Sequence, residues 1–202
     1  MGFFKLDGLF YKTVSFIFNL LLLNLLWFIF SLPLFTIGAS TTALFYVAGK
    51  IIRQEQPELV KDFWHSFKLN FRQASIIQLI LLLAYLIIWT NLSNTHLFTG
   101  VFRLFIPLQF FLLLELVIIT LYIFPLLARY EVTIVNALKA AWWLAHRHLI
   151  STFLALLVIP GMLYLLYWQG IFLFFAGAIY ACWVSGILKR VFAQDLNQLL
   201  QS

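Results

Sequence analysis

Long apolar blocks, separated by short charged or turn-forming stretches, divide the chain into six segments. A run of about 18 or more mostly apolar, uncharged residues is long enough to cross a bilayer as a helix. The blocks lie at residues 13–31, 34–49, 74–92, 104–127, 149–168 and 171–188. This pattern predicts an all-α, polytopic transmembrane helix bundle of about six spans, which forms a single integral membrane domain over residues 1–202.

The second block is the shortest. Its sixteen residues, 34–49, extend roughly 24 Å at about 1.5 Å per residue, against a hydrocarbon core of about 30 Å. With six crossings, twelve of the thirteen Lys and Arg residues lie on the cytoplasmic side, but only ten do so if this block fails to cross. Because basic residues concentrate in cytoplasmic loops, we expect six crossings, with both termini in the cytoplasm.

Two predicted cytoplasmic loops have helical periodicity. Their apolar stripes are Val60, Phe63, Trp64, Phe67 and Phe71 in the first, and Ile134, Leu138, Trp142, Ala145 and Leu149 in the second. Such a face opposite Lys and Arg is typical of a helix in the membrane interface, and equally of a cytoplasmic helix packed on the inner end of the bundle. We therefore expect two amphipathic helices on the cytoplasmic side.

Composition and charge support this interpretation. The chain is 64% hydrophobic and 10% charged, whereas soluble domains are about 45–50% apolar and about 25% charged. The net charge of +6 comes from basic residues at the ends of apolar blocks, not from one basic stripe of the kind that binds nucleic acid. A water-soluble protein is excluded, and the expected partner is the lipid bilayer of the plasma membrane, with no nucleic acid.

Glu115 is the only carboxylate in the six predicted spans, and it lies near the middle of the fourth. An ionisable group at that depth costs roughly 2.5–3.5 kcal/mol on insertion scales, so it normally faces the protein interior or a polar cavity. One interpretation is a proton or cation site, and the other is a protonated Glu that hydrogen-bonds a neighbouring helix. Candidate partners are Asn19, Asn24 and Gln78, and the two asparagines are expected to make separate interhelical hydrogen bonds.

Small residues gather on two of the predicted spans. On the second span and the sixth, respectively, they are Gly38, Ser40 and Thr42, and Gly177, Ala181 and Ser185. Small residues at such spacing let helix backbones approach closely. We expect helix packing, within the chain or between copies, rather than a ligand path.

The sequence has no recognisable catalytic or metal-binding motif. His146 and His148 are two residues apart, so they point in different directions on a helix, and no Cys or carboxylate flanks them closely. A phosphate-binding P-loop and a Gly-x-Ser-x-Gly elbow are both missing. We therefore predict no catalytic residue, metal or cofactor, and no enzymatic activity.

A family resemblance covers nearly the whole chain. Its most specific part is the stretch at residues 33–43, Pro-Leu-Phe-Thr-Ile-Gly-Ala-Ser-Thr-Thr-Ala. Also matching are Asp7-Gly8, Asn24, Trp27, Ser66-Phe67, Asn70-Phe71, Gln73-Ala74, Ala128-Arg129-Tyr130 and Asn136-Ala137. Together these resemble the YesL-like family, a bacterial integral membrane family of unknown function (domain of unknown function 624). Its genes often lie beside genes for carbohydrate uptake and breakdown, so the resemblance implies an association with sugar transport.

Two functions fit these observations. The first is a non-enzymatic accessory or regulatory component associated with carbohydrate uptake, whose partners would be carbohydrate transporter subunits or a second copy of the chain. The alternative is a small proton- or cation-coupled transporter or channel that uses Glu115. The first is favoured because the spans hold few polar groups and the amphipathic helices offer docking surfaces, while the link to carbohydrate rests on the resemblance.

Overall fold

The structure, a computed structural model, describes residues 9–97, 100–168, 170 and 173–199. Its elements are α1 (Leu9–Ser31), η1 (Leu34–Thr36), α2 (Ile37–Ile52), α3 (Leu59–Ser93), η2 (Thr95–Leu97), η3 (Gly100–Leu104), α4 (Phe105–Arg129), α5 (Ile134–Arg147), α6 (Leu149–Trp168) and α7 (Leu173–Leu199). The predicted all-α class is confirmed over these residues. Lys5, Asp7, Gly8 and both chain ends lie outside them.

Five helical segments are long and apolar enough to cross a membrane. They are Thr13–Ser31, Leu34–Ile52, Leu59–Ser93, Phe105–Arg129 and Phe174–Phe192. The pair Ile134–Arg147 and Leu149–Tyr164 meets the same criterion together, but it is bent by 97° at the break between α5 and α6. The described residues thus hold five helices of spanning length, or up to six if that pair forms one broken span, which is compatible with the predicted membrane bundle.

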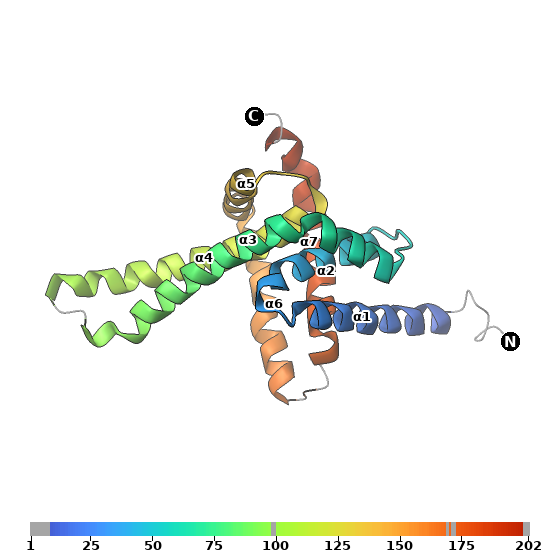
Figure 1. The fold of residues 1–202 in the computed structure, drawn as a ribbon, viewed down its shortest axis with the longest axis horizontal. Helices are drawn as coiled ribbons and strands as arrows, with labels where there is room; N and C mark the ends of the chain where they lie inside the picture. The colour runs from blue at the N-terminus through green and yellow to red at the C-terminus, as the bar shows by residue number, and fades with distance from the viewer. Residues whose placement is uncertain (1–8, 98–99, 169, 171–172, 200–202) are drawn as a thin grey trace.

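α2 lies at the centre of the fold. Figure 1 shows the α3–α4 hairpin reaching to one side, α1 to the other, and the α6–α7 hairpin running across them. α2 packs against α1, α3, α4 and α7, and its small residues explain why. Ala39, Ala43 and Ala48 are completely buried, and such short side chains let neighbouring backbones approach.

α3 differs from the prediction. The first amphipathic segment is not a separate helix, because α3 continues without a break from Leu59 to Ser93. No Pro or Gly interrupts residues 59–93, so nothing in the local sequence stops the helix. The rings of Phe63 and Phe67 are buried, with centroids 5.6 and 5.1 Å from that of Phe30 on α1. Part of the apolar face therefore packs on α1.

α5 is a separate helix, as predicted for the second amphipathic segment. It begins after Thr133, whose hydroxyl accepts a hydrogen bond from the backbone N–H of Asn136 at 3.4 Å, a typical N-cap. Ala137 and Ala141 are completely buried, whereas Trp142 of the predicted stripe is 51% exposed. The packed face is thus the alanine face, since small side chains allow α5 to lie close to α4. The position of α5 on the cytoplasmic side stays a prediction.

Candidate functional site at the junction of α4, α5 and α6

Glu115 of α4 forms an ion pair or hydrogen bond with His146 near the end of α5. The His146 Nε2 atom lies 3.1 Å from Glu115 Oε1, and the Glu115 side chain is 15% exposed against 38% for His146. The other ring nitrogen, Nδ1, lies 2.9 Å from the backbone carbonyl oxygen of Trp142. Glu115 therefore has a partner on a neighbouring helix, but Asn19, Asn24 and Gln78, the candidates predicted from the sequence, do not provide it.

The hydrogen-bond geometry limits how protons are distributed over this pair. A carbonyl oxygen can only accept, so Nδ1 of His146 must carry a hydrogen to bond Trp142. One further proton is then needed between Nε2 and Oε1, and it belongs either to a neutral carboxyl or to an imidazolium. In both arrangements the pair of Glu115 and His146 has no net charge. A pair without net charge is far less costly at membrane depth than an isolated carboxylate.

A second polar contact, two turns along α4, joins this helix to α6. The hydroxyl groups of Tyr122 and Thr152 are 2.8 Å apart, and both side chains are buried. Because the Thr152 hydroxyl donates to the Ala145 carbonyl at 2.8 Å, the Tyr122 hydroxyl is the donor to Thr152. Residues seven apart lie on one helix face, so Glu115 and Tyr122 together attach α4 to the bend between α5 and α6.

One atom of the site has no partner among the described residues. Glu115 Oε2 is buried and accepts no hydrogen bond there. A buried polar oxygen without a partner is unusual in proteins, and it could accept a hydrogen bond from a water molecule or bind a cation. Among the described residues, no group of three or more His, Cys, Asp or Glu side chains is arranged to hold a metal ion.

The other polar candidates lie away from Glu115. Asn24 is buried on α1, and its Oδ1 atom accepts a hydrogen bond from the backbone N–H of Ala178 on α7 at 3.2 Å. Asn19 is half-buried and lines a shallow groove beside the start of α3. Gln78 of α3 packs with its Cβ atom against Gly38. The structure therefore distributes these three side chains over separate helix contacts.

The small residues of α2 lie where this helix meets α1 and α3. A Cβ atom on Gly38 would clash with the Ala74 carbonyl oxygen of α3, so only glycine permits this approach. The Ser40 hydroxyl is 2.6 Å from that of Ser31 on α1. The Thr42 hydroxyl donates to the Gly38 carbonyl at 2.8 Å within α2. Both the Ser40 and the Thr42 side chains are completely buried and form hydrogen bonds within the protein.

The small residues of α7 have more than one environment. A Cβ atom on Gly177 would come within 2.7 Å of Asn24 Oδ1, so this glycine lets α7 approach α1. Ala181 is completely buried, whereas Ser185 is half-buried and lines a recess beside Lys189.

His146 is the residue of the site that the sequence analysis rejected, because it was weighed only as a metal ligand. Its partner Glu115 is 31 residues away, so no short-range spacing could indicate the contact. The useful signal was an amphipathic helix that directly follows α4, since a short connection brings consecutive helices together.

Comparisons with known proteins place the chain in a family context. Residues 20–92, which cover the second half of α1, all of α2 and nearly all of α3, match the model of the family described as "Protein of unknown function, DUF624". A curated relative, "Uncharacterized protein YteU" of Bacillus subtilis (strain 168), is 31% identical over 115 residues, which cover 54% of this chain. The chain spans about half the length (50%) of that relative. No solved structure is significantly similar to the chain. The two matches support membership of the chain in the DUF624 family, the YesL-like family that its sequence resembles.

Proposed function

We propose that this membrane protein is a non-enzymatic accessory component associated with carbohydrate uptake. The observation that carries the proposal is the pairing of Glu115 with His146 at 3.1 Å. Proton transport needs a carboxyl group that takes up and releases the proton along a path, and cation transport needs a carboxylate that is charged and open to the path. Here the carboxylate belongs to an uncharged pair that ends at the Trp142 carbonyl, as expected of an interhelical contact. The link to carbohydrate uptake comes from the family resemblance alone.

The exposed face of α5 is the surface proposed for partner binding. Val135 and Trp142 are 59% and 51% exposed, and Lys139 is exposed on the same helix. An aromatic and basic surface of this kind suits a partner protein at the membrane surface. The partners that fit the proposal are carbohydrate transporter subunits or a second copy of the chain. A pull-down from native membranes tests this, with Trp142→Ala as the variant expected to lose the partner and Trp89→Ala as the matched control.

The proposal places both termini and the 53–58 loop in the cytoplasm of a cell whose plasma membrane the chain crosses. Its support is the distribution of the thirteen basic residues. Reporter fusions at both ends and within residues 53–58 should report a cytoplasmic location, and a fusion after Asn94 should report the outside. An external N-terminus would contradict six crossings and make α2 a re-entrant helix.

The central test replaces Glu115 in the full chain. Glu115→Gln keeps one N–H that can donate to neutral His146 Nε2, so the unfolding free energy in mixed micelles should change by less than about 0.5 kcal/mol. Glu115→Leu removes the hydrogen bond and leaves a polar ring atom unpartnered. It should destabilise by about 1–2 kcal/mol, towards the lower end of the usual range because His146 is partly exposed.

The alternative function, a small proton- or cation-coupled transporter, is favoured by the Oε2 atom of Glu115, which has no hydrogen-bond partner among the residues that the structure describes. It predicts pH-dependent flux of protons or cations in liposomes that contain the wild-type chain. It also predicts that Glu115→Gln abolishes this flux while the protein stays folded. Flux in the wild type that is lost in a folded Glu115→Gln variant would overturn the accessory proposal. Equal leakage of empty and protein-containing liposomes would support the accessory proposal.

A further inference from the structure

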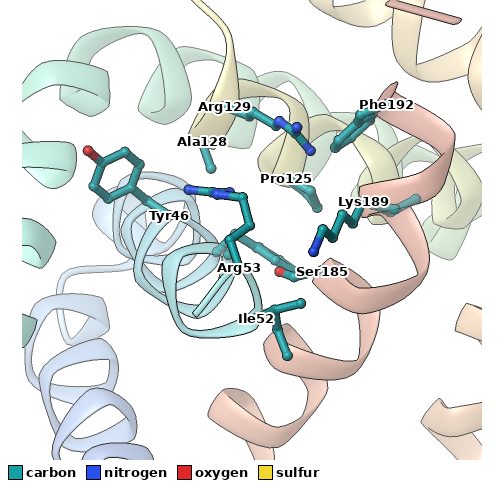
Figure 2. A pocket seen from close by; sticks show the side chains of 12 residues that line it. Tyr46, Ile52, Arg53, Pro125, Ala128, Arg129, Ser185, Lys189 and Phe192 are labelled. Carbon is teal, nitrogen blue, oxygen red and sulfur yellow. The ribbon is translucent and has the colours of Figure 1, made fainter. Parts of the chain in front are cut away.

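Three basic side chains surround one recess at the end of the fold where α2 and α4 stop. Arg53 directly follows α2, Arg129 is the last residue of α4, and Lys189 belongs to α7. Figure 2 shows the three side chains approaching the recess from different sides, with the Ser185 hydroxyl below them. Its volume is about 100 Å³. Segments far apart in the sequence thus bring positive charge to a single small cavity.

The walls of the recess are apolar. They consist of side chains that are almost or completely buried: Phe45, Pro125, Ala128, Leu188 and Phe192. The guanidinium of Arg129 lies 5.8 Å from the centre of the Phe192 ring, a cation–π contact that holds its orientation. Since apolar walls lower the local dielectric, a charge that enters this recess is attracted more strongly than at an open surface.

One carboxylate offsets part of the positive charge. Glu55 Oε1 lies 2.6 Å from Arg53 Nε. The Arg53 guanidinium beside Glu55 holds the pKa of that carboxyl below its usual value, and Arg129 contributes from farther away. In the part of the chain that the structure describes, Lys189 forms no salt bridge. Three cations against one carboxylate leave a surplus of positive charge at the recess.

Ordinary structural reasons explain only part of this arrangement. A cation near the C-terminus of a helix is favoured by the helix dipole, which accounts for Arg53 and Arg129 individually. Lys189 lies well inside α7, which continues to Leu199, so the dipole does not account for it. The positive-inside rule places basic residues on one side of a membrane, but it does not direct them into one cavity. A bound anion would explain why the three cations converge on one cavity.

A mostly apolar groove, whose lining also includes Ser151 and Arg190, adjoins the recess. Ile52 lines both, and the groove continues along a neighbouring face of α7 towards α1 and α6, with a volume of about 670 Å³. Its lining includes Phe16, Leu154 and Trp183, which are 43%, 44% and 52% exposed. In a bilayer such a groove between apolar helices is the place of an acyl chain or of another helix. A basic recess that meets an apolar groove matches the two ends of a phospholipid.

We propose that the recess binds the phosphate group of an anionic membrane phospholipid, whose acyl chain lies in the groove beyond Ile52. The small volume admits one phosphate group but not a whole nucleotide or sugar, for which pockets of about 300–1,000 Å³ are typical. The planar guanidinium groups of Arg53 and Arg129 match phosphate oxygens, and Lys189 adds a point charge. Basic pockets between spans on the cytoplasmic side are suited to such head groups. A soluble phosphate would use the same cations but would leave the groove unused.

The first experiment compares two lipids with identical acyl chains, phosphatidylglycerol and phosphatidylcholine, on the purified full chain. Native mass spectrometry counts the lipids that remain bound as the detergent is removed. We expect at least about tenfold preference for phosphatidylglycerol, reduced about tenfold or more by Lys189→Gln. The matched control is Lys68→Gln, which removes an exposed lysine of α3 outside the recess. Equal retention of the two lipids, or equal effects of the two lysine variants, would overturn the proposal.

The second experiment tests the groove without touching the cations. Gly186 lines the groove, and a Cβ atom added there meets nothing within 4 Å, so Gly186→Leu fills the groove without a clash at its own position. It should lower retention of phosphatidylglycerol several-fold. Gly161→Leu, at another glycine with open space, should leave retention unchanged. Both variants must elute and unfold like the wild type, and a folded Gly186→Leu that retains the lipid fully would contradict the acyl-chain position.

A third arm separates the lipid from a free anion. Millimolar inorganic phosphate is added to the wild type in phosphatidylcholine micelles, and the thermal unfolding temperature is followed. We expect no stabilisation by inorganic phosphate and clear stabilisation by phosphatidylglycerol, lost in Lys189→Gln. Stabilisation by inorganic phosphate equal to that by the lipid, and insensitive to Gly186→Leu, would show that the recess serves a soluble phosphate and would overturn the lipid assignment.

Discussion

α1 and α2 follow each other in the chain and pack together, but one exposes most of its surface and the other is largely enclosed. Of the most apolar stretch of α1, 17% is buried inside the protein, against 56% for the segment that contains α2. Phe18 and Phe28 of α1 are 61% and 54% exposed, whereas Ala39 and Ala43 of α2 are completely buried. The more hydrophobic helix is thus the outer one, and the helix with glycine, alanine and hydroxyl side chains is the inner one.

This contrast follows from the bilayer as a solvent. Lipid tails are as apolar as leucine, so no hydrophobic force drives the large side chains of α1 into the protein. Small residues allow close van der Waals contact, and hydroxyl groups need hydrogen-bond partners, so both favour the protein centre. The contacts of Ser40 and Thr42 with protein partners are examples. In this pair of helices, therefore, the more hydrophobic one is the more exposed, and the one with small and hydroxyl side chains lies in the core.

The largest expected effect comes from enlarging the centre of the inner helix. In Gly38→Leu, the new side chain would meet the Ala74 carbonyl and the Gln78 Cβ atom, the latter at 2.9 Å. Because backbone cannot move aside cheaply, α2 and α3 must separate, at a cost of about 3 kcal/mol or more. We expect loss of the monodisperse peak in size-exclusion chromatography, or a much lower unfolding free energy in mixed micelles.

Gly161→Leu in α6 is the matched control for this substitution. A Cβ atom at Gly161 meets nothing within 4 Å, so the same change in size should leave stability unchanged or slightly raised, since leucine favours helix over glycine. Similar behaviour of the two variants would mean that α2 is not the tightly packed centre.

Most of the helices could be predicted from the sequence because apolar length is a local property. The predicted block at residues 149–168 coincides with α6, and the block at 104–127 differs from α4 by one or two residues at each end. There are two exceptions. α7 continues to Leu199, eleven residues beyond the predicted end at residue 188, and in α3 charge was taken as a sign of a separate loop helix. Lys68 and Arg72 are exposed along one continuous helix, so the charges mark where the helix leaves the apolar layer and not where it ends.

The contacts of the candidate site could not be predicted in the same way. Glu115 was selected as a group that needs a partner because of its position in an apolar run, and in the structure that partner is His146. The partner depends on how α4 and α5 cross, which is decided by the buried Ala137 and Ala141. The larger apolar residues of α5 predicted a neighbouring face of the helix: Ile134 and Leu138 of that stripe are half-buried against the core, whereas Trp142 is 51% exposed. In a membrane protein, the rule that large apolar side chains face the core misleads at such positions.

The second-largest effect is expected from a pair of substitutions that compares the two faces of α1. Leu23 is completely buried and Leu25 is 51% exposed. Leu23→Ala leaves a cavity between helices and should lower the unfolding free energy by about 2 kcal/mol or more. Leu25→Ala shortens an exposed side chain without leaving a cavity inside the protein. The unfolding free energy should therefore fall by about 0.5 kcal/mol or less. Both values come from unfolding in mixed micelles. Equal losses would indicate that the outer face of α1 is covered, for example by a second copy of the chain.

The smallest expected effect concerns the hydrogen bond that joins the outer helix to the inner one. Trp27 Nε1 donates to Thr41 Oγ1 at 3.1 Å. Trp27→Phe removes the donor while keeping an aromatic ring, and Thr41→Val removes the acceptor while keeping the side-chain shape. Interhelical hydrogen bonds in membrane proteins average about 0.6 kcal/mol by double-mutant cycles. We therefore expect a coupling energy near that value, measured by unfolding the two single variants and the double variant in mixed micelles.

This cycle separates two ways in which α1 could be attached to α2. If the hydrogen bond contributes, the double variant is less destabilised than the sum of the two single variants, since the second substitution removes a contact already lost. If packing alone holds α1, the single effects add and the coupling is zero. Trp89→Phe is the control for exchanging the ring, because Trp89 is 71% exposed. It should change the unfolding free energy by less than Trp27→Phe does. A coupling well above 1 kcal/mol would contradict the picture of α1 as a lipid-facing helix held by few specific contacts, because it would make this single bond the main attachment of the helix.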